Sequence, residues 1–145
     1  MFRNILVPID GSPLSAKPLD SALEFAKANH GKIVALSVSE PRVFYSSDPD
    51  ASKHGDVHED ANLQKAQLHL QKVAETARNA DVACETVIVQ SRTPGEEIID
   101  VANHYGCDAI FMATRGSFGV IEKLFNESQT HKVLEGASVP VVVFP

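Results

Sequence analysis

The sequence has little cysteine, no tryptophan and no long apolar run. Cys84 and Cys107 are its two cysteines, and no Cys-x-x-Cys spacing occurs, so we expect two free, buried thiols near the starts of two strands. No stretch approaches the roughly 18 consecutive apolar residues of a membrane helix, and the first residues lead into a strand without the pattern of a signal peptide. We therefore expect a cytoplasmic protein that does not enter a membrane.

Positive charge is also scarce. The formal net charge is −6, and no run of lysine or arginine forms the basic stripe that a phosphate backbone selects, so nucleic acid is not an expected partner. Hydrophobic residues make up 43% and charged residues 22%, which are ordinary fractions for a folded globular chain. The length of 145 residues predicts one domain that covers residues 1–145.

Apolar runs alternate with stretches of helical periodicity along the chain. The runs predict five strands, at residues 4–9, 33–38, 82–89, 108–113 and 139–144. Apolar residues at helical spacing predict four helices, at residues 15–30, 58–80, 93–105 and 128–135. Residues 42–57 show no periodicity and predict a mobile loop, a candidate lid or partner surface.

Strands that alternate with helices predict an open parallel α/β sheet with helices on both faces, since each crossover returns the chain to the same edge. Ligands of such sheets bind beyond the carboxyl ends of the strands, where the strand order reverses. Candidate site residues therefore lie in the loops that follow the strands, at residues 10–12, 39–40, 90–92 and 114–119.

The loop after the fourth predicted strand contains two glycines, two hydroxyl side chains and an arginine, and Ser128 follows at a predicted helix start. Backbone N–H groups of a glycine loop and of a helix N-terminus together form an anion site. The alternative is a plain turn followed by a helix cap. The loop is not a Walker A sequence, and no G-x-G-x-x-G occurs, so neither standard phosphate fingerprint applies.

Several segments resemble the universal stress proteins, in order and spacing over nearly the whole chain. They are Ile-Leu-Val-Pro-Ile-Asp-Gly-Ser at 5–12, Pro-Gly-Glu-Glu-Ile at 94–98, Met-Ala-Thr-Arg-Gly at 112–116, the helix start at 128–134, and Val-Pro-Val-Val-Val at 139–143. The resemblance implies a Rossmann-like, adenine nucleotide alpha hydrolase-like fold with strand order 3-2-1-4-5. It also implies a homodimer formed along residues 139–144, which would pair an otherwise open sheet edge.

The resemblance further implies an adenine-nucleotide site for ATP or AMP, with Mg²⁺, between the first and fourth strands. Family members that bind ATP carry Gly-x2-Gly-x9-Gly-Ser/Thr after the fourth strand, an Asp that closes the first strand and an apolar residue that closes the second. The corresponding residues here are Asp10, Val38, Ala113, Thr114, Arg115, Gly116, Gly119 and Ser128.

The phosphate motif departs from this pattern at two positions. Ala113 replaces the first glycine, and Glu127 replaces the last one, with one residue too many in between. A rival register, which uses Gly116 and Gly119 with Gln129 and Thr130, also lacks the last glycine. A carboxylate beside a triphosphate repels it, so the sequence leaves nucleotide binding open. Asp10 has an alternative role as a cap for the following turn and helix, with Ser12 assisting.

The resemblance implies a stress-response regulatory protein whose ligand biases a change of partner or conformation. The alternative is a nucleotide-independent homodimeric interaction module, and a third possibility is a slow ATP hydrolase. No catalytic residues are expected, because the sequence has no G-x-S-x-G and no serine, histidine and carboxylate set that the topology would bring together. His54 and His58 are four residues apart, but Gly55 argues against a helix there, so we expect a solvated loop without a metal.

Overall fold

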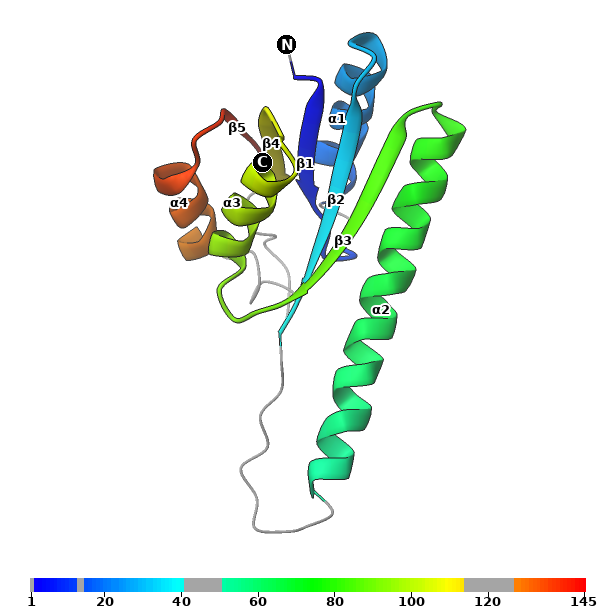
Figure 1. Ribbon diagram of the computed structural model, residues 1–145, viewed down its shortest axis with the longest axis vertical. Helices are drawn as coiled ribbons and strands as arrows, with labels where there is room; N and C mark the ends of the chain where they lie inside the picture. Colours follow the sequence, from blue (N-terminus) through cyan, green and yellow to red (C-terminus); the bar gives the residue numbers. More distant parts are fainter. Residues whose placement is uncertain (1, 13–14, 41–50, 114–126) are drawn as a thin grey trace.

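The computed structural model describes residues 2–12, 15–40, 51–113 and 127–145, and for residues 51–60 and 127–128 it describes the backbone. Strands and helices alternate along these ranges (Figure 1). In chain order they are β1 (Asn4–Pro8), α1 (Ala16–Ala28), β2 (Lys32–Ser39), α2 (Ala51–Asn79), β3 (Ala83–Gln90), α3 (Pro94–His104), β4 (Ala109–Ala113), α4 (Glu127–Gly136) and β5 (Val141–Phe144).

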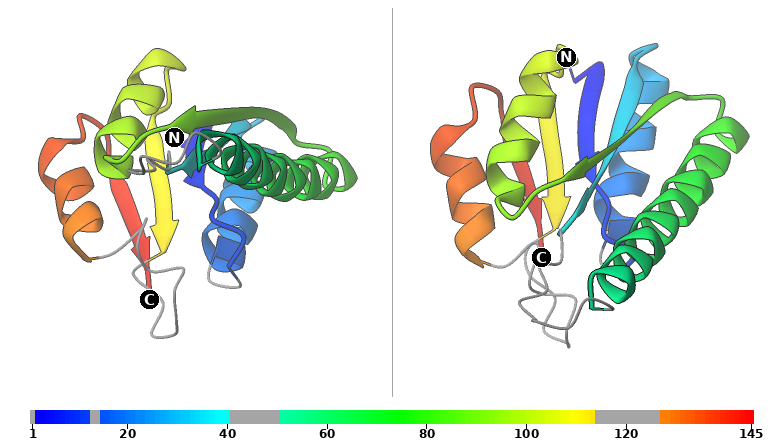
Figure 2. Two further views of the ribbon diagram at one scale, coloured as in Figure 1. Left: turned by 90° about the horizontal axis from the view of Figure 1, so that it is seen from below. Right: turned by 60° about the horizontal axis from the view of Figure 1, so that its bottom comes forward.

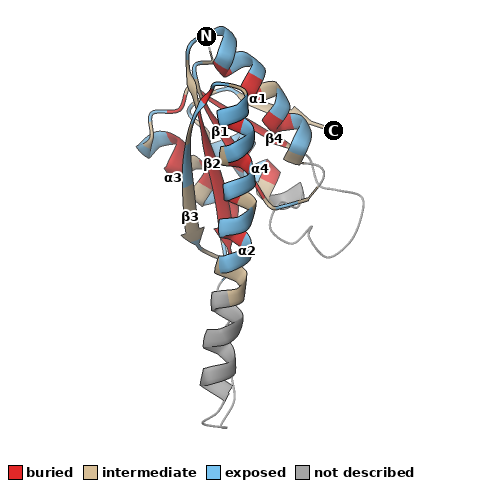
Figure 3. Cartoon of the chain, turned by 90° about the vertical axis from the view of Figure 1, so that its right-hand side faces the viewer, coloured by how far each residue is buried: buried red, intermediate tan, exposed pale blue. Residues whose placement is uncertain are grey.

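The strands form one parallel sheet in the order β3-β2-β1-β4-β5, which confirms both the predicted fold class and the 3-2-1-4-5 order. Helices α1 and α2 cover one face, and α3 and α4 cover the other (Figure 2). Alternate residues of a strand point to opposite faces, so Ile5 and Val7 of β1 enter the core under α1 and α2, whereas Leu6 enters the core under α3 and α4. The central strands are therefore buried on both sides (Figure 3).

Apolar residues at helical spacing predict the buried side of each helix, with Leu19, Ala22, Leu23 and Ala26 in α1 and Ile98, Val101, Ala102 and Tyr105 in α3. The prediction is confirmed for α1, and for α3 apart from Tyr105, which is half-buried. In α1 the residues at helical spacing, Leu19, Ala22, Leu23 and Ala26, are all buried, as are Ile98, Val101 and Ala102 in α3. The same spacing predicts Thr130, Val133, Leu134 and Ala137 on one side of α4, and this holds in part. Thr130 and Val133 are buried and Ala137 is half-buried, whereas Leu134 is 49% exposed. Leu134 is one residue, or about 100° of helix, beyond Val133, and this rotation carries it off the side that meets the sheet.

The second helix is longer than predicted. It begins at Ala51, so the expectation of a loop through residue 57 and of a helix from residue 58 is wrong. Gly55 lies inside this helix; a glycine in a helix interior costs about 1 kcal/mol, which a helix of 29 residues tolerates. The side chains of His54 and His58, and residues 42–50 of the predicted loop, lie outside the described residues.

The last strand is shorter than predicted, beginning at Val141 instead of residue 139. Pro140 has no N–H to donate to a ladder, although its carbonyl accepts a hydrogen bond from the backbone N–H of Ile110 at 3.0 Å. The thiol prediction is also met only in part. Both cysteines are free, but Cys107 is buried and Cys84 is only half-buried.

Side-chain contacts fasten the amino-terminal segment to the sheet. The two carboxylate oxygens of Asp108 accept hydrogen bonds from the backbone N–H groups of Arg3, at 2.9 Å, and Asn4, at 3.1 Å. The ring of Phe2 packs edge-on against Phe25 and Phe111, each with a centroid separation of 5.7 Å. These contacts set the start of β1 beside β4. None of the helices in the described ranges has the length and apolarity needed to cross a membrane.

Candidate functional site

The candidate site lies at the edge of the sheet where the strands end. Helices α1, α3 and α4 begin at this same edge, because each follows a strand and runs back along the sheet (Figures 1 and 2). Strand β1 pairs with β2 through five residues, from Asn4 to Pro8, but with β4 only through Ile5 and Leu6. The order of connections also reverses between β1 and β4, which is where open α/β sheets bind ligands.

Asp10 sits in a tight turn directly beyond β1. Its Oδ1 accepts a hydrogen bond from the backbone N–H of Ser12 at 2.8 Å and another from the hydroxyl of Ser15 at 2.7 Å. Gly11 between them has φ of +80°, a left-handed conformation that strongly favours glycine. The predicted role of Asp10 as a cap of the turn is therefore confirmed, whereas neither of these two bonds goes to a backbone N–H of α1, so they do not show the helix-capping part of that prediction.

Ser15 stands at the predicted start of the first helix, where a serine side chain can cap the first turn. It occupies the N-cap position, yet its hydroxyl makes no cap hydrogen bond and donates to Asp10 instead. The carboxylate of Asp10 thus fixes the relation of β1 to the start of α1. Both of these hydrogen bonds end on Oδ1, and Oδ2 takes part in neither of them.

Val38 is the next-to-last residue of β2 and its side chain is only 3% exposed. It packs in the core under α3 and α4, together with the partly buried Val89 of β3. The carbonyl of Ser39 accepts a hydrogen bond from the backbone N–H of Ser91 at 3.0 Å, which closes the end of this strand pair. Val38 is therefore at the predicted edge, but it offers a ligand mainly its backbone.

Ala113 is the last residue of β4 and is half-buried at the same edge. Thr114, Arg115, Gly116 and Gly119 lie outside the described residues. Ser128 is the second residue of α4, in the first turn of the helix, where backbone N–H groups have no partner within the helix. The structure therefore brings Asp10, Val38, Ala113 and the Ser128 backbone to one edge of the sheet.

The rival register of the phosphate motif fits the described structure poorly. The side-chain oxygen of Gln129 accepts a hydrogen bond from the backbone N–H of Gly95 at 2.9 Å, so this side chain is turned toward the start of α3. Thr130 is buried, with 9% of its surface exposed. The side chain of Thr130 is therefore covered, and that of Gln129 is half-buried and engaged with the start of α3.

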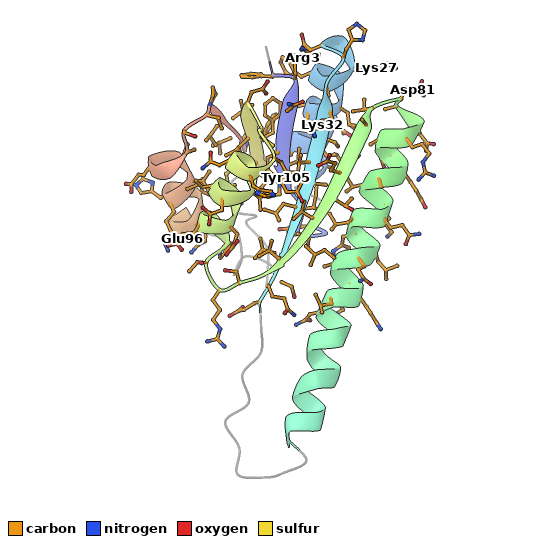
Figure 4. The ribbon with its side chains drawn as sticks, viewed as in Figure 1. Arg3, Lys27, Lys32, Asp81, Glu96 and Tyr105 are labelled. Atoms are coloured by element: carbon orange, nitrogen blue, oxygen red, sulfur yellow. The ribbon has the colours of Figure 1, made fainter. Side chains whose placement is uncertain are left out.

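Several basic side chains of the described residues lie at the opposite edge of the sheet. Arg3, Lys27 and Lys32 gather where the strands begin, whereas Glu96 lies near the edge where they end (Figure 4). Lys32 is also paired with Glu85 at 3.1 Å. Exposed basic residues of the described ranges near the candidate site include Arg92, in the loop between β3 and α3, and Lys17, the second residue of α1, and an anion there would depend on such side chains and on backbone N–H groups. The described residues contain no histidine, cysteine and carboxylate cluster that could hold a metal ion.

One residue near the site was not singled out by the sequence. His69 of α2 is half-buried and its imidazole lies directly against Gly11, so that a Cβ at position 11 would overlap the ring. From the sequence, His69 is one of four histidines scattered singly on predicted helices or at their ends, for which a surface or hydrogen-bonded structural role is expected. Its spacing of three and four residues from the buried Ala66 and Val73 was the available signal, because such residues share one side of a helix.

The whole chain matches a known family. The universal stress protein family model matches residues 1–145. The Universal stress protein YxiE of Bacillus subtilis is 32% identical over 148 residues, which covers 99% of both chains. The chain belongs to the universal stress protein family.

Solved structures agree in fold. The Universal stress protein UspA from Lactobacillus plantarum superposes with a TM-score of 0.81 at 21% identity, covering 99% of this chain and 98% of that one. A universal stress protein from Archaeoglobus fulgidus, solved in complex with dAMP, superposes with a TM-score of 0.70 at 20% identity and covers 100% of both chains. At these identities the likeness concerns the fold alone.

Proposed function

We propose that this chain is a stress-response regulatory protein that binds an adenine nucleotide beyond the ends of β1 and β4. The observation that carries the proposal is the meeting of the Asp10 turn, the end of β2 and the first turn of α4 at the one edge where the strand order reverses. The dAMP complex of the Archaeoglobus fulgidus protein supports a nucleotide as the ligand class.

The residues at this edge have distinct parts in the proposed site. Oδ2 of Asp10 would accept hydrogen bonds from adenine or ribose, while Oδ1 maintains the turn. The backbone at Val38 would line the adenine. The N–H groups at the start of α4 would face the phosphates of ATP or AMP, where the helix dipole favours negative charge. Mg²⁺ would neutralise part of the negative charge of the phosphates and so reduce their repulsion by the carboxylate of Glu127.

The residues at this edge support regulation by a bound nucleotide better than they support hydrolysis of ATP. Asp10 is the carboxylate that the structure holds in the turn beyond β1, and its Oδ1 is already engaged by Ser12 and Ser15. A general base must reach the proton it abstracts, and the bonds to Ser12 and Ser15 hold Asp10 in the turn. We propose that nucleotide binding shifts a partner or conformational equilibrium, with ATP hydrolysis slow if it occurs.

A homodimer along β5 is part of the same proposal. In the described ranges, Val141–Phe144 pairs with β4 on one side only, and all four residues are half-buried. An apolar strand with an open edge is a template for pairing with another chain. Pairing with a second copy of β5 would cover this edge, and Val143→Pro, which removes a backbone N–H, should then favour monomers in sedimentation experiments.

A second candidate function is a nucleotide-independent interaction module that uses the same dimer. The observations that favour it are the nearly complete burial of Val38 and the engagement of Asp10 in its own turn. Ala113 adds a methyl group where the family motif has glycine. In this case β5 and the outer surfaces would carry the function, and the candidate site would be only a structural turn.

Calorimetric titration with ATP and with AMP, each with Mg²⁺, separates the two candidates. The nucleotide proposal expects saturable binding and a higher unfolding temperature with ligand. It also expects weaker binding by Asp10→Ala, with the exposed Asp20→Ala as a matched control on α1. Heat signals that never saturate, and an unfolding temperature unmoved by millimolar nucleotide, would support the interaction module. Steady release of ADP that Ser128→Ala abolishes would instead indicate an ATP hydrolase.

A further inference from the structure

His69 of α2 packs on the turn that holds Asp10, although the two segments are far apart in the chain. The buried residues Ala66, Leu70 and Val73 anchor this side of α2 to the sheet. His69 lies on the same side of the helix and is half-buried beyond this core, over Gly11. The ring therefore occupies the space that a side chain at position 11 would need.

Hydrogen bonds among Asp10, Ser12 and Ser15 hold the turn under His69, and they include those from the backbone N–H of Ser15 to the carbonyl of Ser12 at 3.2 Å and from the backbone N–H of Asp10 to the hydroxyl of Ser15 at 3.5 Å. Gly11 holds φ of +80°, and the neighbouring hydrogen bonds run from the Ser12 N–H and the Ser15 hydroxyl to Oδ1 of Asp10. Glycine gives the chain many alternative conformations, so a left-handed glycine turn orders at a substantial entropic cost. A planar ring packed on Gly11 excludes those alternatives that move the Gly11 backbone toward α2.

We propose that His69 is a positioning residue that holds the Gly11 turn closed and so orients the carboxylate of Asp10 toward the nucleotide. The nucleotide in this proposal comes from the proposed function. The contact between His69 and Gly11 does not depend on that function. The side chain acts through shape: its ring restrains the backbone between Asp10 and Ser12. Position 69 thereby links the placement of α2 to the geometry of the site.

Hydrogen exchange of the Ser12 amide tests the restraint without any ligand. His69→Ala should speed this exchange about tenfold, because the turn opens more often once the ring is gone. His69→Phe keeps a planar ring and should restore slow exchange. Gln71→Ala, an exposed position on the same helix, is the matched control and should leave the Ser12 amide unchanged. Equal Ser12 exchange in His69→Ala and the unsubstituted protein would overturn the proposal.

A pair of substitutions tests the contact itself. Gly11→Ala suffers both from the left-handed φ and from overlap with the ring, so we expect its unfolding temperature to fall by about 6 °C. In the His69→Ala background the overlap is removed, and Gly11→Ala should lower the unfolding temperature by only about 3 °C. The same loss in both backgrounds would show that the ring does not restrain position 11.

The nucleotide titration then separates this inference from the proposed function. If the unsubstituted protein binds ATP or AMP, His69→Ala should weaken binding about tenfold and His69→Phe should recover most of it. Unchanged affinity in His69→Ala would overturn the positioning role while leaving the proposed function intact. If the unsubstituted protein binds neither nucleotide, the proposed function fails, and the orienting role fails with it. The Ser12 exchange and the Gly11 pair still decide whether the ring restrains the turn.

Discussion

The side chain of Gln129 caps the start of α3 from the neighbouring helix. Its Oε1 accepts a hydrogen bond at 2.9 Å from the backbone N–H of Gly95, 34 residues earlier in the chain. Thr93 occupies the N-cap position of α3 but makes no side-chain cap hydrogen bond. Gln129 therefore satisfies one of the free N–H groups of this helix and fixes α4 beside α3.

Gln129→Leu should destabilise the protein by about 1–3 kcal/mol, since it leaves the buried N–H of Gly95 without its acceptor. The expected fall in unfolding temperature is about 2–4 °C for each kcal/mol. Gln129→Glu keeps an acceptor oxygen and should lose much less. Equal losses in the two variants, measured by thermal denaturation, would show that the hydrogen bond contributes little.

Alanine substitutions at Gly31 and Gly106 should destabilise the protein for different reasons, steric overlap at position 31 and an unfavourable φ at position 106. A Cβ at position 31 would overlap the carbonyl of Arg3, which accepts a hydrogen bond from Lys32 at 2.7 Å, so Gly31→Ala must displace the start of β1. We expect a loss of about 3 kcal/mol. Gly106 has φ of +64° and open space around it, so Gly106→Ala should cost about 1 kcal/mol from conformation alone. Denaturant titration measures both losses, and a larger loss at position 106 would contradict this account.

Both cysteine thiols should react slowly in the folded protein. Burial raises the pKa of each thiol from the ordinary 9.0 to about 11, and the carboxylate of Glu85 adds to the rise at Cys84. Because the thiolate is the reactive form, labelling at pH 8 should be about a hundredfold slower than in the unfolded chain. A disulfide reagent such as dithionitrobenzoate measures these rates, with the guanidinium-unfolded protein as the control.

The same pKa shifts give the thiols a pH-dependent effect on stability. Below about pH 9 they are protonated in both folded and unfolded chains and have no effect on the balance. As pH rises from about 9 to about 11, the thiols of the unfolded chain ionise first, which lowers the free energy of unfolding. The Cys84→Ala, Cys107→Ala double variant should show a shallower loss of stability over this range. Identical slopes in the two proteins would contradict the shifted pKa values.

Glu127→Gly should strengthen ATP binding about tenfold if the first turn of α4 faces the phosphates, because the substitution removes a like charge from that turn. Glu135→Gly makes the same change of charge at the far end of the helix, where the side chain is 74% exposed, and should leave ATP affinity unchanged. Calorimetry on both variants is the measurement. Unchanged or weaker binding by Glu127→Gly would reject the register that pairs Glu127 and Ser128 with the family motif.

Asp10, beyond β1, and Gln129, in α4, differ in how far the sequence could predict their surroundings. Asp10 follows a buried strand and precedes Gly11 and Ser12, so its place at the sheet edge and its capping of the turn follow from local pattern. The orientation of Gln129 does not, because its partner Gly95 belongs to another helix. The start of α2 at Ala51 was missed for a related reason. Gly55 weakens the local helical pattern, and the continuous helix overrides that local preference.

By itself the sequence determined the alternation of strands and helices, the parallel sheet and the buried sides of α1 and α3, because apolar periodicity reports which side of each element avoids water. Tertiary structure alone decided that the ring of His69 lies against Gly11, that Gln129 reaches Gly95 and that Leu134 stays exposed. Periodicity describes one element at a time. Which distant segment meets a given side chain depends on how the helices pack across the sheet, and only the folded chain contains that information.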